Sequence, residues 1–147
     1  MSGFEEQYKT IHVDREELGE NRIQTVKDGL EITSVGKPLT GFEVEIRSGN
    51  GAALPEQCVG RIWAKGPSVM EGYLDGTPPP LVADWLDTGD VGFLHEGELY
   101  ITGRAKDVIV IRGRNHNPNH IESAVNAVDG VRTGCAAAVG DISENGE

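Results

Sequence analysis

The sequence is poor in cysteine and in basic residues, and each shortage argues against a class of protein. Only two cysteines occur among 147 residues, Cys58 and Cys135, far apart and outside any Cys-x-x-Cys spacing. They argue against a disulfide framework or a cysteine zinc site and fit a reducing compartment. Lysine and arginine number 13 against 24 acidic residues, and the resulting net charge of −11 argues against a nucleic acid or an anionic membrane as partner.

Long apolar segments are also absent. No run approaches the ~20 residues that a membrane-spanning helix needs, and the N-terminal MSGFEEQYKT has neither the basic segment nor the apolar core of a signal peptide. A content of 37% hydrophobic and 25% charged residues is ordinary for a soluble globular protein with one domain or two small lobes. We therefore expect a cytoplasmic protein without a membrane span.

Alternating apolar and polar residues predict a succession of β-strands. Phe42, Val44 and Ile46 alternate with charged residues, as in a half-buried strand. The run at residues 108–111 is continuously apolar, which predicts a strand buried on both faces. Further strands are expected at residues 11–13, 23–26, 59–65, 97–102 and 135–139, the last of them buried.

Two short helices are indicated by their start signals. Asp14, with Glu17 three residues on, is typical of a capped helical turn. Asn117 before Pro118 opens a second helix, because proline at the first position loses no hydrogen bond. The sequence thus predicts an α+β fold that is mainly β. An antiparallel, barrel-like β lobe covers residues 1–103, a boundary lies near 104–107, and a partial αβ lobe covers 108–147.

Asp90 is the first candidate for a binding residue. It follows Thr-Gly, and a carboxylate on such a tight turn can accept hydrogen bonds from both hydroxyls of a vicinal diol, such as a ribose. The simpler interpretation is that Asp90 closes a turn. Gly103 and Arg104 follow on the next expected strand, and Lys106 comes just after them.

The run RGRNHNP at residues 112–118 allows two other interpretations. A nucleic-acid loop is opposed by the acidic net charge and by the absence of interleaved aromatic residues. A metal site at His116 and His120 is opposed by Pro118, which places a loop-to-helix boundary between them, and by the lack of a third ligand. We therefore expect no metal site.

The order of these residues resembles a known family. Residues 85–122, WLDTGDVGFLHEGELYITGRAKDVIVIRGRNHNPNHIE, resemble the ribose-binding and hinge region of the adenylate-forming superfamily and are most similar to the fatty acyl-AMP ligases. The stretches at residues 13–18, 34–41 and 59–73 fit as well, and the resemblance spans roughly residues 11–140.

The resemblance implies roles for three residues. Asp90 would hold the ribose, Arg104 would contact the ribose or the phosphate side of the nucleotide, and Lys106 would be the hinge, within residues 104–107, about which a small C-terminal domain swings. No catalytic residue is expected here, because the family's phosphate loop and adenine-binding segment are absent and its catalytic lysine would fall beyond residue 147. The chain is expected to be a fragment that is inactive alone.

The parent enzyme implied by the resemblance uses ATP with Mg²⁺ to convert a fatty or other carboxylic acid into an acyl-adenylate, and transfers the acyl group to a carrier protein. Two alternatives stay open. The parent is an acyl-CoA ligase, or the chain is a non-catalytic β module with a docking or structural role.

Overall fold

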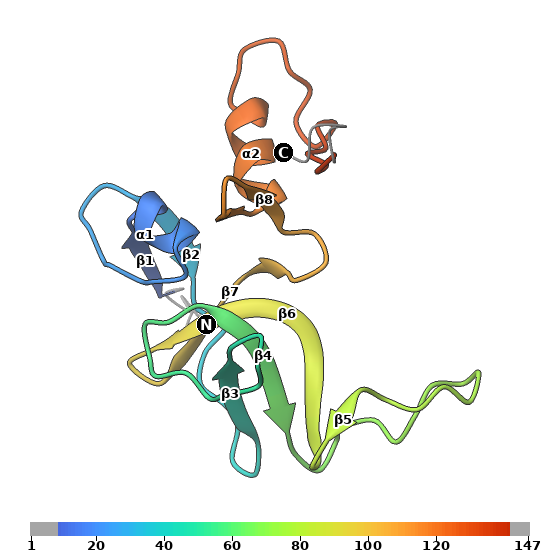
Figure 1. Cartoon of the computed structure of the whole chain (residues 1–147). Helices are drawn as coiled ribbons and strands as arrows, with labels where there is room; N and C mark the ends of the chain where they lie inside the picture. Colours follow the sequence, from blue (N-terminus) through green and yellow to red (C-terminus); the bar gives the residue numbers. More distant parts are fainter. Residues whose placement is uncertain (1–8, 142–147) are drawn as a thin grey trace, which may run out of the picture.

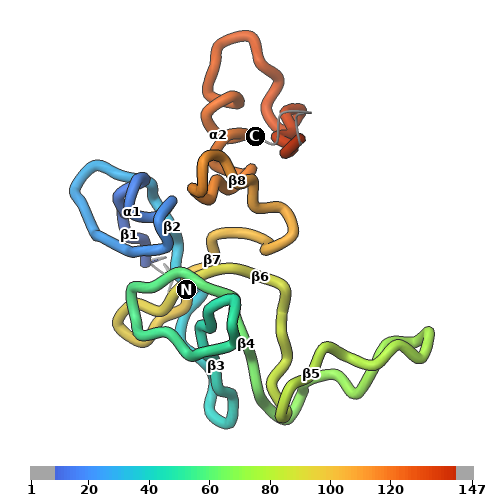
Figure 2. Tube along the Cα trace, viewed as in Figure 1, coloured from blue at the N-terminus to red at the C-terminus, as the bar shows by residue number. Residues whose placement is uncertain are grey.

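The computed structural model describes residues 9–141 and is mainly β, with a curled antiparallel sheet (Figures 1 and 2), which confirms the predicted fold class. The strands are β1 (Thr10–Val13), β2 (Leu30–Thr33), β3 (Glu43–Arg47), β4 (Gly60–Lys65), β5 (Leu81–Val82), β6 (Trp85–His95), β7 (Glu98–Arg104), β8 (Ile109–Ile111) and β9 (Arg114–His116). The helices are α1 (Arg15–Gly19) and α2 (Pro118–Asn126).

The main sheet has five antiparallel strands in the order β3-β4-β6-β5, with β7 also paired to β6. β6, 11 residues long, curves through the centre of the molecule (Figure 1). The segment after β2 runs beside β7: Val35 N–H donates to Leu99 O and Leu99 N–H donates to Gly36 O, both at 2.9 Å. Strand β6, which carries Asp90, pairs with both β4 and β7.

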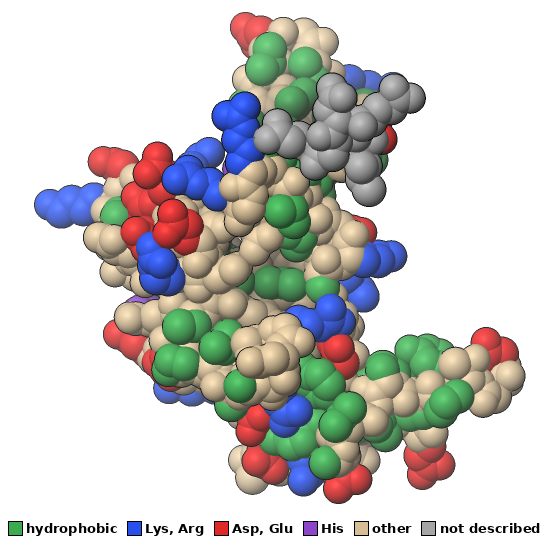
Figure 3. Space-filling model, viewed as in Figure 1, with side chains coloured by type: hydrophobic (Ala, Val, Ile, Leu, Met, Phe, Trp, Pro, Cys, Tyr) green, Lys and Arg blue, Asp and Glu red, His purple; other side chains and the backbone are tan. Residues whose placement is uncertain are grey.

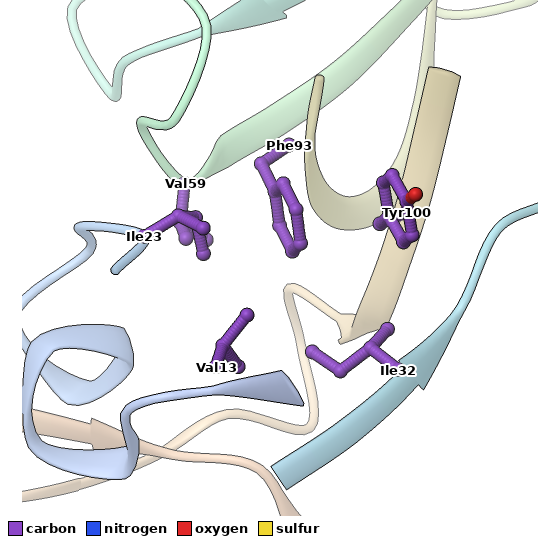
Figure 4. Packing of buried hydrophobic residues seen from close by; sticks show 6 residues of the cluster. All are labelled: Val13, Ile23, Ile32, Val59, Phe93 and Tyr100. Carbon is purple, nitrogen blue, oxygen red and sulfur yellow. The ribbon is translucent and has the colours of Figure 1, made fainter. Parts of the chain in front are cut away.

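The core lies between the β1–β2 ribbon and the β6–β7 hairpin (Figure 4). Phe93 and Tyr100 are cross-strand partners, and their rings stack with centroids 5.0 Å apart. Both side chains are fully buried, and burying an aromatic or aliphatic side chain of this size contributes roughly 1.5–3 kcal/mol. The other members of this cluster are aliphatic: Val13, Ile23, Ile32 and Val59.

Local hydrogen bonds form the two helix starts as the sequence predicts. Asp14 Oδ1 accepts from the backbone N–H of Glu16 at 2.8 Å and of Glu17 at 3.0 Å. Asn117 Oδ1 accepts from Asn119 N–H at 3.0 Å, with Pro118 in the first turn. Both caps satisfy N–H groups that have no partner inside the helix. No helix in the described part of the chain is long and apolar enough to span a membrane.

The arm between β4 and β6 reaches away from the body of the molecule (Figure 1). It includes the three prolines at residues 78–80, which the sequence predicts to lie in an exposed loop, and they do. Apolar side chains gather on its surface (Figure 3), among them Tyr73, Leu81 and Val82, which are 40–58% exposed.

Two strand predictions are wrong, and a third is right about the strand but wrong about its burial. Residues 108–111 are not buried on both faces, because β8 pairs only with β9 and leaves Val110 and Ile111 64% and 50% exposed. Residues 135–139 form no strand: Ala138 N–H donates to the Glu122 carboxylate at 2.9 Å rather than to a strand. Residues 23–26 make isolated bridges at most, although Ile23 is buried.

Candidate functional site

Asp90 lies inside strand β6 and not on a tight turn, which corrects the expectation from the Thr-Gly-Asp sequence. Asp87 pairs with Trp63, and Val91 pairs with Arg61. Between these pairs β4 supplies a single residue, whereas β6 supplies residues 88–90. We call residues 87–90 the β6 bulge. Its Gly89 has φ +77°, a conformation that glycine adopts at little cost, and such bulges bend a strand and redirect its side chains.

Threonine hydroxyls replace backbone hydrogen bonds on both sides of Asp90. Thr88 Oγ1 donates to Ile62 O at 2.9 Å and accepts from Asp90 N–H at 3.1 Å. On the β7 side, where the register shifts again, Thr102 Oγ1 donates to Val91 O at 3.1 Å. These bonds satisfy backbone groups that the irregular register leaves without a strand partner, so the bend is part of the ordered sheet.

Arg104 is the cross-strand partner of Asp90, and its Nε lies 3.0 Å from Asp90 Oδ1. The Asp90 side chain is 28% exposed and that of Arg104 55% exposed. An ion pair this exposed contributes roughly 0–1 kcal/mol to stability. Within residues 9–141 the Asp90 carboxylate has no other side-chain partner, so its second oxygen can accept from a ligand hydroxyl. The two residues named from the sequence thus lie side by side.

Lys106 lies exposed in the turn after β7, which is closed by a 3.1 Å hydrogen bond from Asp107 N–H to Arg104 O. Just before it, Gly103 contacts Asn117, the cap of α2: a Cβ atom at residue 103 would collide with the Asn117 amide. Arg104, Lys106 and Asn117 line a hollow of about 510 Å³ at this junction. The junction between β7 and α2 therefore depends on a residue without a side chain.

A larger groove of about 1020 Å³ separates the sheet from α2. Its walls are largely apolar, with Leu54 and Val59 on one side and Ile121, Val125 and Val128 on the other. Asp90 lines neither hollow, so this apolar groove and the candidate diol-binding carboxylate are different places. We give the carboxylate more weight, because its chemistry selects a ligand and an apolar groove does not.

His116 and His120 both line this groove, on β9 and α2. In the described part of the chain no group of three or more His, Cys, Asp or Glu side chains could hold a metal ion. Burial lowers the pKa of His120, and the neighbouring guanidinium of Arg15 on α1 lowers it further. Arg112 and Gly113 form the β8–β9 turn, with φ of 51° and 77°, a hairpin that the sequence prediction missed.

Sequence reasoning also missed Arg61 and Asp87. Arg61 NH2 lies 2.8 Å from Asp87 Oδ2, and Arg61 Nε donates to Asp87 Oδ1 at 3.2 Å. The two residues are far apart in the sequence, and only the register of β4 on β6 brings them together. No local pattern could have revealed this pair.

Comparisons with known proteins identify relatives of this chain. No protein-family model matches the chain. A putative acyl-CoA synthetase of Caulobacter vibrioides is 43% identical over 134 residues, which cover 86% of this chain and 23% of that protein. The long-chain-fatty-acid–AMP ligase FadD26 of Mycobacterium tuberculosis is 31% identical over 155 residues, covering 92% of this chain and 27% of that protein.

A solved structure from a study of fatty acyl-adenylate ligases from E. coli and L. pneumophila superposes with a TM-score of 0.80 at 35% identity. The match covers 89% of this chain and 25% of that one. The chain therefore spans about a quarter of the length of the curated relatives it matches.

Proposed function

On the premise that this chain belongs to the adenylate-forming superfamily, we propose that it supplies the ribose-binding carboxylate and the hinge of an ATP-dependent fatty acyl-AMP ligase. The observation that carries the proposal is the adjacency of Asp90 and Arg104 at the β6 bulge. A half-exposed carboxylate beside a guanidinium offers acceptors to the two ribose hydroxyls and donors to a nearby nucleotide oxygen.

The reaction proposed for the whole enzyme begins when the carboxylate of a fatty or related acid attacks the α-phosphate of ATP. Acyl-adenylate and pyrophosphate result. The thiol of a carrier protein in the cytoplasm then attacks the acyl carbon, and the thioester forms as the bond to the phosphate breaks and AMP leaves. Asp90 and Arg104 bind and orient the nucleotide, and positioning of this kind accelerates a reaction between two substrates. We assign no Mg²⁺ ligand to the described residues.

Replacing Asp90 tests this proposal directly. In the ligase that contains this chain, Asp90→Ala should cost about 2–3 kcal/mol in ATP use, roughly 30–150-fold in kcat/KM, because a charged hydrogen-bond acceptor is lost. Pyrophosphate exchange measures this effect with ATP and with 3′-deoxy-ATP. The variant should also lose the preference for ATP over the deoxy analogue.

The matched control is Glu71→Ala, which removes an exposed carboxylate from the arm and should leave the exchange unchanged. A loss below threefold for Asp90→Ala, or a preference for ATP that persists in the variant, would count against the ribose assignment.

We also propose that residues 104–107 are the hinge, with Lys106 at its centre, and that they divide a β domain (residues 1–103) from the start of a small C-terminal domain (108–147). The exposure of Lys106 and the short turn around it support this role, because a hinge needs a few residues that absorb a backbone rotation.

CoA is the second candidate acceptor, and the name of the C. vibrioides relative, a putative acyl-CoA synthetase, favours it. Acyl transfer to CoA and to a carrier protein, measured side by side with the same ligase, distinguishes the two acceptors. Faster transfer to CoA would replace the carrier-protein proposal and leave the role of Asp90 unchanged.

A further inference from the structure

The carboxylate of Asp87 connects two parts of the structure at the β6 bulge. Its Oδ1 accepts from Gly89 N–H at 3.0 Å and from Arg61 Nε at 3.2 Å, and its Oδ2 lies 2.8 Å from Arg61 NH2. The Asp87 side chain is only 19% exposed. One side chain thus joins strand β4 to the backbone of the residue before Asp90.

Gly89 is the residue that most needs this support. Glycine at φ +77° lies in a region that it enters and leaves easily, and Gly89 has no side chain of its own to fix its conformation. An aspartate that accepts from the N–H two residues ahead closes an Asx-turn and selects one conformation. The position of the Asp90 carboxylate follows from that conformation, because Asp90 is joined directly to Gly89.

Arg61 has a supporting part in this arrangement. Its guanidinium contacts both Asp87 oxygens, a geometry that fixes the plane of a carboxylate. With the carboxylate held in that plane, Oδ1 remains directed at Gly89 N–H. An exposed ion pair on its own contributes little to stability, so the consequence of this pair is orientation.

We propose that Asp87 is a positioning residue for Asp90, acting through its hydrogen bond to Gly89, and that Arg61 orients Asp87. The inference rests on the proposed function, since a positioned Asp90 matters only if Asp90 binds the nucleotide. Asp87 itself does not touch the substrate. Its role lies in the affinity for ATP and not in the chemical step.

Three variants of the ligase that contains this chain separate the hydrogen bond from the ion pair. Asp87→Ala removes both, and the KM for ATP should rise about tenfold, with kcat within about threefold, as expected for one lost hydrogen bond. Asp87→Asn keeps an oxygen that accepts from Gly89 N–H, and its KM should stay within about threefold of the unchanged protein. The exchanged double variant Arg61→Asp/Asp87→Arg restores the ion pair but places no acceptor at residue 87, so it should be as impaired as Asp87→Ala.

An ATP KM restored in the exchanged double variant would overturn the proposal, because the ion pair alone would then account for the effect of Asp87. An Asp87→Ala variant with an ATP KM within twofold of the unchanged protein would overturn it too. Amide hydrogen exchange of Gly89 in the 147-residue chain provides a readout without activity. Exchange should speed up in Asp87→Ala and stay slow in Asp87→Asn, and equal rates in the two would contradict the hydrogen-bond role.

Two measurements distinguish this inference from the function on which it rests. Thermal unfolding shows whether the Asp87→Ala variant still folds. If that variant does not fold, Arg61→Gln is measured instead, and it should raise the ATP KM by less than the exchanged double variant does. Asp90→Ala is measured in the same assay. If Asp90→Ala leaves the use of ATP unchanged, both the proposed function and this inference are wrong. If Asp90→Ala impairs the use of ATP but Asp87→Ala does not, only this inference is wrong.

Discussion

The β region (residues 9–104) and the C-terminal region (residues 108–141) both contain patterned apolar residues but differ greatly in the burial of these residues. Among the described residues, every buried apolar side chain lies between Val13 and Tyr100. In the C-terminal region the apolar stripe of α2 stays open, with Ile121 and Val125 38% and 40% exposed and Val128 58% exposed. An apolar pattern therefore becomes a core only where the topology supplies a second layer.

The difference has a simple structural cause. In the β region β6 pairs with β4, β5 and β7, and side chains of the β1–β2 ribbon pack in one cluster with Phe93 and Tyr100 of the β6–β7 hairpin. The C-terminal region offers one two-stranded ribbon and one helix of nine residues. A two-stranded hairpin and a helix of this length are each marginal in water. We therefore expect most of the stability to reside in the β region.

The largest expected effect comes from the centre of the β region. Phe93→Ala removes one member of the stacked pair with Tyr100 and should lower the free energy of unfolding by about 3–5 kcal/mol, because it deletes a buried aromatic ring and leaves a cavity. Urea unfolding followed by far-UV circular dichroism measures the change. Val125→Ala, on the open stripe of α2, is the matched control and should cost less than about 1 kcal/mol. Similar losses in both variants would show that the comparison is wrong.

The contrast also shows how far the sequence could predict the fold. The helix caps at Asp14 and Asn117 depend on bonds to residues two or three positions away, and the prediction found both. Residues 108–111 are apolar enough for a buried strand, but burial needs neighbours that the described structure does not place there. Burial is a property of the assembled layers, and a local pattern can only indicate it.

The same distinction between local pattern and strand pairing applies to the candidate site. Thr-Gly-Asp indicates a turn locally, and Gly89 does have a positive φ. Pairing with β4, from a distant part of the sequence, and with β7 across a hairpin makes the segment a bulge within a strand instead. Asp90 and Arg104 were named because of a family resemblance, and the hairpin brings them together. Arg61 and Asp87 could not be found in this way, because only the register joins them. The hinge role of Lys106 stays a prediction.

An intermediate effect is expected at the boundary between the two regions. If the C-terminal region rotates about Lys106, Lys106→Pro in the proposed full-length ligase should hold one orientation, because proline fixes φ near −65°. One half-reaction should survive and the rate of the other should fall by about 10²-fold, since a misplaced reactive group costs about that much.

Pyrophosphate exchange measures adenylation, and transfer from preformed acyl-adenylate measures the second step. Lys106→Ala, which leaves φ free, is the control, and an equal loss in both half-reactions would argue against a hinge.

The smallest expected effect is a pH dependence confined to the C-terminal region. Burial and Arg15 lower the pKa of His120 in the folded chain, below the value near 6.5 that an unfolded histidine has. The unfolded chain then binds the proton first as the pH falls, so the stabilisation is complete above about pH 6.5 and is lost as the pH falls towards the lowered pKa. Protection factors of the α2 amides, corrected for intrinsic exchange, should fall between pH 7 and pH 5, while those of β6 and β7 change less.

His120→Gln should abolish the fall in α2, and His12→Gln, on β1, should leave it in place. A fall of equal size in the His120→Gln variant would assign the pH dependence to groups other than His120.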